Sequence, residues 1–542
     1  MGIPSYFSYI IKNHANIIRK RRQVKSKFSS LYMDCNSIIY DSVRKLEMDA
    51  EPRPPGFDME REIIRNVIAK IESYVNDIQP SNVLYIAFDG VAPFAKMEQQ
   101  RVRRYKHGFP LPTSTKAFNT SAITPGTEFM KALSLNVSRA FVVSGRHFGA
   151  KTIIVSGSDE PGEGEHKMFQ YMRDHALQTE TMAVYGLDAD LIMLGLFHCF
   201  ACENIYIFRE SPEFGRALLG DSFARDELLY LDNRRLASAI LNEMGVAEGS
   251  KDARGRIYDY VFVCFLLGND FLPHFPALNI RTHGNFTILE TYRKLFTKYP
   301  DRRLISLESG NIQWRWVKTL LKEFAKEEHR NITNEYESRA KFEKRFYPTT
   351  TKEERDVAFE NIPTIYRAEE HYINPLELGW EKRYYQMAFH IDAAKIDKTF
   401  IESVCYNYLE GLEWTFKYYT EGCPHWRWKY NHHYPPLFVD LVERIPDFET
   451  TFINEKMGIN TPFHPCTQLS YVIPPWNHHL LPESQRKYLS SNGYSAYYVD
   501  SDKLTFQWMF CKYFWESHAI LPDIPLAVLE KMDSHSGPIS KR

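Results

Sequence analysis

The run VLYIAF at residues 83–88 is an uninterrupted apolar stretch that ends at Asp89 and Gly90. Such a run, followed by a polar turn, is typical of a strand buried in the middle of a sheet. Similar runs lie at residues 31–33 (LYM), 152–155 (TIIV), 182–185 (MAVY) and 205–208 (IYIF), and helical patterns separate them, including residues 60–75 and 127–140. This alternation predicts an α/β fold with a mostly parallel central sheet flanked by helices.

The second half of the chain has a different character. Charged helical patterns come first, and a stretch dense in Trp, Tyr, His and Pro follows them. We therefore predict an α/β core at residues 1–300 and a second region at residues 301–542, helical and then aromatic-rich, which packs on the core.

The overall composition restricts how the chain could bind nucleic acid. Its 542 residues are 44% hydrophobic and 25% charged, with a formal net charge of -1. This composition is that of a globular protein rather than a disordered one. Because positive charge does not dominate, any binding of nucleic acid must come from local basic clusters.

The cysteines and the beginning of the chain indicate the cellular compartment. Eight cysteines are widely spaced apart from Cys199 and Cys202. A single C-x-x-C is weak support for zinc, so buried free thiols in a reducing compartment are predicted. Since no apolar run could cross a bilayer and no secretory signal is recognised, we expect a cytoplasmic protein without membrane association, with the nucleus as the alternative. A basic transit peptide is disfavoured because apolar residues around Tyr6 indicate folded structure.

Acidic residues follow the predicted strands closely. Asp34, Asp89 and Asp188 come shortly after three of the apolar runs, and Asp190 follows Asp188. In an open α/β sheet, ligands bind outside the carboxyl ends of the strands, where these side chains would meet. A single aspartate at such a place is ordinary turn or cap chemistry, whereas the repeated placement predicts a shared site.

Further acids extend this predicted site. The segment PGEGEHK at residues 161–167 places Glu163 and Glu165 two apart in a glycine-rich turn, and Asp270 ends LGND at residues 267–270. Residues two apart share a face of an extended chain, so both glutamates can point into one site. The candidate metal ligands are therefore Asp34, Asp89, Glu163, Glu165, Asp188, Asp190 and Asp270.

These carboxylates would raise one another's pKa unless cations lay among them. Oxygen ligands select Mg²⁺ or Mn²⁺, so the sequence predicts two such ions and hydrolysis of a phosphodiester by metal-bound hydroxide. The alternative is that the acids are helix caps, turn residues and surface charges scattered over the fold.

A predicted helix that starts near Pro93 follows Asp89. One face of this helix carries Lys96, Gln100, Arg103 and Arg104. Arginine forks and a lysine ammonium suit the oxygens of a phosphate, so this face is predicted to hold a terminal phosphate beside the metal site. A solvated basic face is the alternative.

The motifs together closely resemble one family, the eukaryotic-type 5′→3′ exoribonucleases of messenger-RNA decay and nuclear RNA processing. The matching phrases occur in family order at residues 1–4 (MGIP), 31–38, 88–93, 123–130, 161–167, 185–194 and 268–273, and a thinner likeness continues at residues 408–414 and 426–436. The resemblance implies that residues 1–300 form a nuclease catalytic core like that of flap nucleases and PIN domains. The chain looks like a minimal catalytic-core form of the family.

The resemblance also implies roles for the candidate residues. The acids would bind the metal ions, Lys96 would belong to the catalytic set, and Lys96, Gln100, Arg103 and Arg104 would form a pocket for a 5′-monophosphate. The implied substrate is single-stranded RNA with a 5′-monophosphate, degraded 5′→3′ to nucleoside 5′-monophosphates. The implied enzyme is a monomer that acts with decapping or RNA-decay factors.

The sequence departs from the family pattern at two places. Tyr40 stands where the family has a histidine that stacks on the terminal base. We expect Tyr40 to stack on RNA opposite Trp426 or Trp428, with buried packing as the alternative for the tryptophans. Pro110 and Pro112 predict that the basic helix ends earlier than in the family.

Two other functions use some of the same features. A structure-specific flap endonuclease would share the carboxylate site, but a pocket for a 5′ end has little use in internal cleavage. A non-catalytic protein that binds RNA 5′ ends or serves as a scaffold would not need two metal ions.

Overall fold

The computed structural model describes most of the chain. The described residues are 6–24, 26–48, 56–109, 118–144, 148–175, 178–186, 188–210, 227–247, 249–279, 281, 284–453 and 458–536. The phrase MGIP at residues 1–4, together with Pro110 and Pro112, lies outside them.

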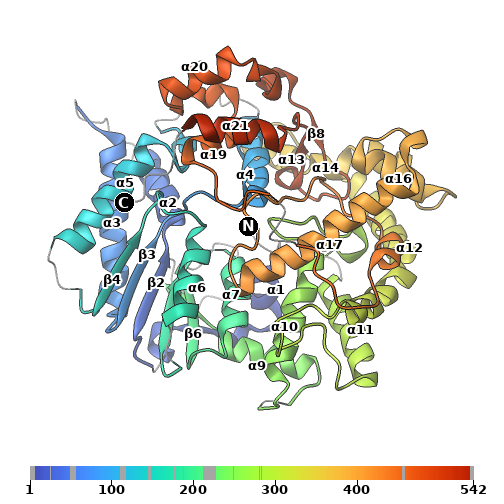
Figure 1. Ribbon diagram of the computed structural model, residues 1–542, viewed down its shortest axis with the longest axis horizontal. Helices are drawn as coiled ribbons and strands as arrows, with labels where there is room; N and C mark the ends of the chain where they lie inside the picture. The colour runs from blue at the N-terminus through green and yellow to red at the C-terminus, as the bar shows by residue number, and fades with distance from the viewer. Residues whose placement is uncertain are drawn as a thin grey trace.

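A seven-stranded sheet in the strand order β1-β7-β6-β5-β2-β3-β4 forms the centre of the first half. Figure 1 shows β4, β3 and β2 of this sheet side by side. The five predicted strands are confirmed and pair in parallel. The strands are β1 (Ile18–Lys20), β2 (Ser30–Asp34), β3 (Val83–Ala87), β4 (Thr152–Ser156), β5 (Thr181–Tyr185), β6 (Asn204–Glu210) and β7 (Leu228–Asp232). The predicted fold class, α/β with a mostly parallel sheet, is therefore correct.

The sheet has one antiparallel edge that the sequence did not predict. β7 pairs antiparallel with β6, and β1 pairs antiparallel with β7. β1 is three residues long and carries Arg19 and Lys20, so it has no apolar pattern of its own. Its strand conformation comes from pairing, in which Arg19 lies opposite Tyr230.

Helices cover both faces of the sheet, as the sequence predicted. Helices α2, α3 and α5 share one apolar core with alternate residues of the strands, and α6, α7, α9 and α10 share another core with the remaining residues. The helices of the first half are α1 (Tyr6–Asn13), α2 (Asn36–Met48), α3 (Met59–Ile78), α4 (Phe94–His107), α5 (Glu128–Ser138), α6 (Gly164–His175), α7 (Asp190–His198), α9 (Asn233–Glu243), α10 (Ala253–Cys264) and α11 (Gly284–Lys298).

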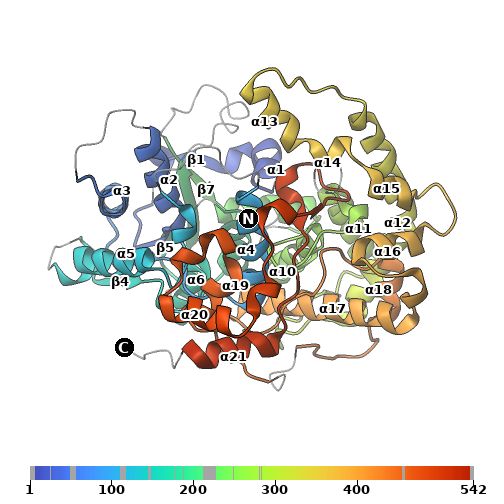
Figure 2. The same ribbon diagram turned by 90° about the horizontal axis from the view of Figure 1, so that it is seen from above.

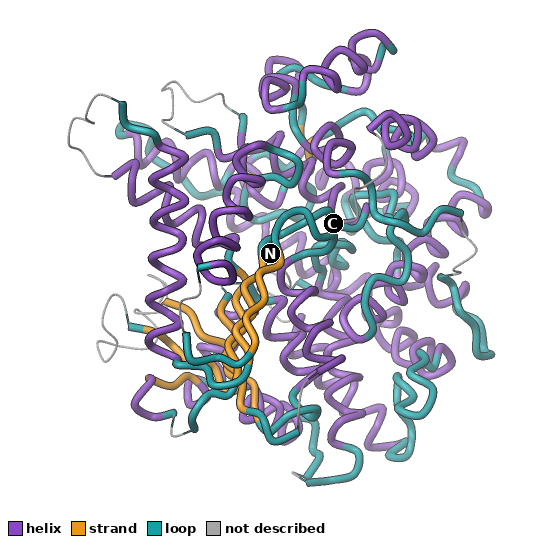
Figure 3. The backbone as a smooth tube through the Cα atoms, turned by 60° about the vertical axis from the view of Figure 1, so that its left-hand side comes forward, coloured by secondary structure: helices purple, strands orange, loops and turns teal. Residues whose placement is uncertain are grey.

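The second half consists mainly of helices, and Figures 1 and 2 show it beside and above the sheet layer. Its helices are α12 (Trp314–Glu343), α13 (Lys352–Glu360), α14 (Ile362–Ile365), α15 (Ala368–Ile373), α16 (Trp380–Phe389), α17 (Lys398–Thr420), α18 (Phe438–Arg444), α19 (Pro465–Val472), α20 (Glu483–Ser491) and α21 (Leu526–Ser536). The tube in Figure 3 shows the main sheet as one bundle of strands, with helices and long loops over the rest of the molecule. Two-residue strands β8 (Phe506–Gln507) and β9 (His518–Ala519) form a small separate ribbon.

α4 joins the two halves. Phe94 and Met97 on this helix share an apolar core with Leu469 of α19 and Leu529 of α21. The helix ends at His107, which agrees with the predicted early end. Because second-half helices pack against α4, the basic helix is fixed relative to the sheet.

Two smaller predictions concern cysteines and membranes. Cys199 and Cys202 are buried free thiols, as the sequence predicted. Within the described residues, no helix is both long enough and apolar enough to cross a membrane.

Candidate active site

The carboxyl ends of β2 and β3 bring the first acids together. Asp34 is the last residue of β2 and lies opposite Ala87 in the register, so Asp89 follows at the same edge of the sheet. Carboxylate oxygens of Asp34, Asp89 and Glu165 all lie within 4.8 Å of one another. This convergence is the one expected of residues that follow neighbouring parallel strands.

The start of α6 brings Glu165 into this group. Gly164 donates its backbone N–H to Asp89 Oδ1 at 2.8 Å. A Cβ atom at position 164 would lie 2.8 Å from Asp34 Oδ1, closer than side chains approach, so the backbone can come this near only as glycine. The glycine-rich turn therefore allows the helix to begin directly against the aspartates.

Lys96 lies among the acids rather than in solvent. Its ammonium donates to Asp270 Oδ2 at 2.6 Å and forms an ion pair with Glu163. Gln99, on the next turn of α4, donates to Asp270 Oδ1 at 3.2 Å. Although burial lowers the pKa of Lys96, Asp270 and Glu163 raise it above its usual value, so the lysine stays charged. α4 thus supplies a fixed positive charge to the acidic cluster.

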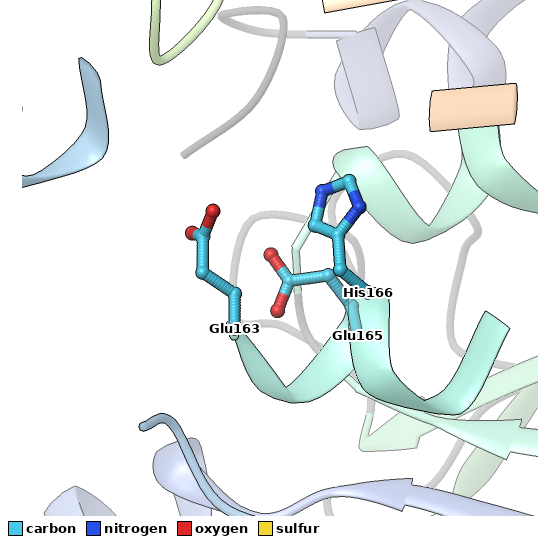
Figure 4. A group of neighbouring side chains, drawn as sticks. All are labelled: Glu163, Glu165 and His166. Carbon is cyan, nitrogen blue, oxygen red and sulfur yellow. The ribbon is translucent and has the colours of Figure 1, made fainter. Parts of the chain in front are cut away.

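His166 completes a second group of potential metal-binding atoms. Atoms of Glu163, Glu165 and His166 lie within 4.8 Å of one another, and Figure 4 shows the three side chains gathered at the start of α6. All three residues are buried. Glu165 belongs to both groups, so its carboxylate could contribute to either of them.

The acids raise one another's pKa. Burial raises the pKa of Asp34 well above its usual range, and the charges of Asp89 and Asp188 raise it further. Burial, followed by the charges of Glu163 and Asp34, does the same to Glu165. Each carboxyl is therefore costly to ionise without added positive charge nearby.

One oxygen of Asp34 also lacks a compensating partner within the described residues. Its Oδ1 atom is buried and has no hydrogen-bond partner within the described residues. A buried carboxylate oxygen without a donor is unusual in a stable fold and is commonly explained by an ion or water. The site's oxygen donors, their burial and this unsatisfied atom all suit a hard divalent cation such as Mg²⁺ or Mn²⁺.

Asp188 and Asp190 lie at the start of α7 and differ in exposure. Asp190 is buried, and burial together with Asp270 raises its pKa to about 6. Asp188 is exposed, and its charge raises the pKa of Asp34. Tyr419 of α17 donates its hydroxyl to Asp190 Oδ1 at 2.6 Å.

The predicted phosphate-binding residues lie along α4. Gln100 is buried, and its Oε1 atom accepts a hydrogen bond from Gln468 of α19 at 3.3 Å. Arg104 donates to the Ile123 carbonyl at 3.2 Å. Burial lowers the pKa of Arg104 to about 10, with Tyr40 raising it and Arg103 lowering it. These influences place Tyr40 and both arginines in one neighbourhood.

The two candidate tryptophans occupy different environments. Trp428 is buried, stacks on Trp414 with ring centroids 5.4 Å apart, and donates from Nε1 to Glu410 at 3.0 Å. This arrangement corresponds to the buried-packing alternative. Trp426 is half-buried, and its carbonyl accepts a hydrogen bond from the Phe94 backbone N–H at the start of α4.

A cavity of about 470 Å³ lies beside α4 and adjoins two of the acids. Its lining includes the polar side chains of Arg103, Lys106, Asp188 and Asp270. The aromatic rings of His433 and Trp515 also line it. The cavity therefore places cationic groups of α4 and two of the acids around one space.

Sequence reasoning did not identify His166, Tyr418 and Tyr419 as part of the site. Tyr418 donates its hydroxyl to Glu163 Oε1 at 3.0 Å, and its ring stacks on His166 with centroids 3.6 Å apart. The position of His166 directly after Glu165 was a usable signal. The sequence contained no such signal for the two tyrosines, because buried tyrosines are common on helices that have only a structural role.

Two family descriptions match the chain, one in each half. Residues 1–211 match the family described as XRN 5'-3' exonuclease N-terminus, and residues 251–375 and 368–532 match the Xrn1 helical domain. The chain is 27% identical to 5'-3' exoribonuclease 2 of Gallus gallus, over 96% of this chain and 68% of the relative. It is 28% identical to 5'-3' exoribonuclease 1 of Homo sapiens, over 89% of this chain and 31% of the relative.

A solved structure, the catalytic core of Rad2 in complex with DNA substrate, covers 78% of this chain and 96% of its own. The sequence identity is 14% and the TM-score is 0.31. The family matches cover both halves of the chain, including the acids at the carboxyl edge of the sheet and the second-half helix α17. The chain therefore belongs to the XRN family of 5'-3' exonucleases.

Proposed function

We propose that this chain is a divalent-metal-dependent 5′→3′ exoribonuclease, which hydrolyses 5′-monophosphorylated RNA to nucleoside 5′-monophosphates. The observation that carries the proposal is the buried carboxylate cluster at the edge of the sheet, with the basic helix α4 beginning beside it. The relatives named 5'-3' exoribonucleases support RNA as the substrate and the 5′ end as the start.

The two groups of metal-binding atoms support a site for two ions. Asp34, Asp89 and Glu165 would hold one ion, and Glu163, Glu165 and His166 would contribute to the second. Two bound Mg²⁺ or Mn²⁺ ions would supply an activated water and stabilise charge on the leaving oxygen. Asp190 and Asp270 add buried negative charge beside them.

The guanidinium groups of α4 would bind the 5′-phosphate. The Nε atom of Arg104 is buried and makes no hydrogen bond within the described residues, so a phosphate oxygen would satisfy it. Arg103, on the neighbouring position of the helix, presents a second fork. A pocket sized for a monophosphate would exclude a cap or a triphosphate.

The cavity beside α4 supports release of one nucleotide at a time. Its volume of about 470 Å³ lies within the range of about 300–1,000 Å³ that is typical of small-ligand sites. Arg103 lines it together with Asp188 and Asp270, so a single nucleotide held there would lie beside the acids. Stacking of the terminal base of the RNA on Tyr40 and Trp426, which do not line this cavity, is a separate part of the proposal.

The test compares RNAs that differ only at the 5′ end. The full chain would be incubated with Mg²⁺ and RNA bearing a 5′-monophosphate, triphosphate, hydroxyl or cap. We expect mononucleotides from the monophosphate alone and none after addition of EDTA. Asp34→Asn should abolish the reaction with every RNA.

Arg104→Gln tests the phosphate contact separately, and Lys131→Gln serves as its control because Lys131 is an exposed lysine that pairs with Glu128 one turn before it on α5. Arg104→Gln should remove the preference for the monophosphate, whereas Lys131→Gln should keep it. Equal degradation of all four RNAs by the unmodified chain would refute the 5′ pocket. Internal fragments would point to an endonuclease, and binding without hydrolysis would point to a 5′-end binding protein.

We also infer a cellular role from the family. The chain would act as a monomer in RNA decay, in the cytoplasm or the nucleus, after decapping factors have exposed a 5′-monophosphate. Light scattering of the purified chain and localisation of a tagged copy would check the first two statements.

A further inference from the structure

Helix α17 reaches from the second half of the chain to the acids at the edge of the sheet. Tyr418 donates its hydroxyl to Glu163 Oε1 at 3.0 Å, and the adjacent Tyr419 donates to Asp190 Oδ1 at 2.6 Å. The four residues are at least nine-tenths buried. Two consecutive tyrosines thus hold two different carboxylates that start different helices.

The rings of the tyrosines are held as firmly as their hydroxyls. Tyr418 is stacked on His166 at 3.6 Å and lies 4.7 Å from Trp414, centroid to centroid. Tyr419 meets His166 edge-on at 5.4 Å and Phe265 at 5.3 Å. Aromatic pairs at such distances favour particular ring orientations, so neither hydroxyl can turn away without disturbing the core.

These hydrogen bonds leave further acceptor positions on the two carboxylates for a metal ion. A phenol O–H donates one bond, whereas an ionised carboxylate has about four acceptor positions on two oxygens. Lys96 pairs with Oε2 of Glu163, and Tyr418 takes Oε1, so the plane of this carboxylate is defined from both sides. The remaining lone pairs then point in fixed directions.

We propose that Tyr418 and Tyr419 are positioning residues, which orient Glu163 and Asp190 for metal binding. The inference rests on the proposed metal-dependent function and extends it, because it makes the second half of the chain part of the metal site. Groups that hydrogen-bond a ligating carboxylate typically contribute about 10- to 100-fold to metal affinity or activity.

Tyrosine-to-phenylalanine variants test the proposal because they remove the hydroxyl and keep the ring. We would prepare Tyr418→Phe, Tyr419→Phe and the control Tyr384→Phe in the full chain. Tyr384 is a buried second-half tyrosine whose hydroxyl donates to the Pro435 carbonyl at 2.9 Å rather than to an acid. Each variant loses one buried hydrogen bond, so the three should show similar losses of Tm without metal.

The deciding measurement is Mn²⁺ affinity, obtained by calorimetry without RNA. We expect the Kd for Mn²⁺ to rise about 10-fold in Tyr418→Phe and Tyr419→Phe and to stay unchanged in Tyr384→Phe. Hydrolysis by the two variants should recover at high Mn²⁺ concentration. Unchanged Mn²⁺ affinity in both variants, with normal RNA hydrolysis by the unmodified chain, would overturn the positioning role alone.

A failure of the proposed exoribonuclease function would give different results in these measurements. If the unmodified chain binds Mn²⁺ but does not degrade RNA, the exoribonuclease proposal is wrong, and the tyrosine variants still report on metal positioning. If the unmodified chain binds no Mn²⁺, both proposals are wrong.

Discussion

The active-site acids and the ion pairs around Glu370 are both buried charge clusters, but they are built in opposite ways. Glu370, on α15, is fully buried and accepts hydrogen bonds from Arg339 Nε at 2.9 Å, Arg367 Nε at 2.6 Å and the Phe510 backbone N–H at 2.9 Å. At the edge of the sheet, carboxylates face one another, and Asp34 Oδ1 has no partner within the described residues.

The difference separates a structural cluster from a functional one. Two guanidinium groups satisfy the carboxylate of Glu370, so this cluster needs nothing further. In the acidic cluster, burial and neighbouring carboxylates raise the pKa of Asp34 and Glu165 at a cost in stability, which is the behaviour expected of a site that binds a cation. Burial of charge alone would not distinguish the two, whereas the balance of charge does.

The largest expected effect is on catalysis. Glu165 belongs to both groups of metal-binding atoms, so Glu165→Gln should lower the rate of mononucleotide release by at least about 1,000-fold, equivalent to about 4 kcal/mol. Single-turnover assays with 5′-monophosphorylated RNA would measure the loss. Residual activity within tenfold of the unmodified chain would show that the acidic cluster is not the catalytic centre.

The next effect concerns the cluster around Glu370, in which two guanidinium groups balance the carboxylate. Glu370→Gln removes the buried carboxylate that Arg339 and Arg367 share and should lower the free energy of unfolding by about 3–5 kcal/mol. Denaturant titration would measure it. Glu343→Gln, at a half-buried partner of Arg367, is the control and should cost less than about 1 kcal/mol. A small loss in Glu370→Gln would mean that the network is not what stabilises α15.

Glu165→Gln should change the free energy of unfolding in the opposite direction to Glu370→Gln. Without metal, the substitution removes a charge that faces Asp34 and Glu163, so the free energy of unfolding should rise by on the order of 1 kcal/mol. The same titration in EDTA would detect the gain. A decrease, in the direction expected for Glu370→Gln, would contradict the view that the acids repel one another.

The smallest effect is a pH dependence. The pKa of Asp190 is raised to about 6, so this carboxyl contributes stability to the metal-free chain at low pH and loses it as the pH rises through about 6. Protons compete with metal, so the increase in Tm caused by Mg²⁺ should shrink as the pH falls through about 6. Asp190→Asn should flatten this part of the curve. Thermal denaturation at several pH values, with and without Mg²⁺, would check both statements.

The sequence predicted those parts of the fold and site that depend on local pattern. The apolar runs identified β2 to β6, and the rule for parallel strands placed Asp34 and Asp89 at one edge. The glycine turn also indicated that Glu163 and Glu165 would converge, and they do, although Glu165 lies in the first turn of α6 rather than in the extended chain that the sequence predicted. Whether these residues bind metal, and whether Gln100, Arg103 and Arg104 bind phosphate, stays a prediction.

The parts that depend on contacts between distant residues were not predictable. β1 is a strand because β7 lies beside it, and no apolar pattern marks it in advance. Tyr408 and Tyr418 are buried tyrosines on the same helix, yet one donates to the Pro273 carbonyl and the other to Glu163. Only the packing of α17 against the core decides which tyrosine meets an acid.

The reach of α17 across the sequence also bears on the order in which the protein folds. Tyr418 and Glu163 are 255 residues apart, and Tyr419 and Asp190 are 229 residues apart. Contacts closed over such long loops form late, and during synthesis the N-terminal part folds first. We therefore expect the sheet to gather its acids before the tyrosines arrive, so that an incompletely synthesised chain carries the acids but lacks the geometry to use them.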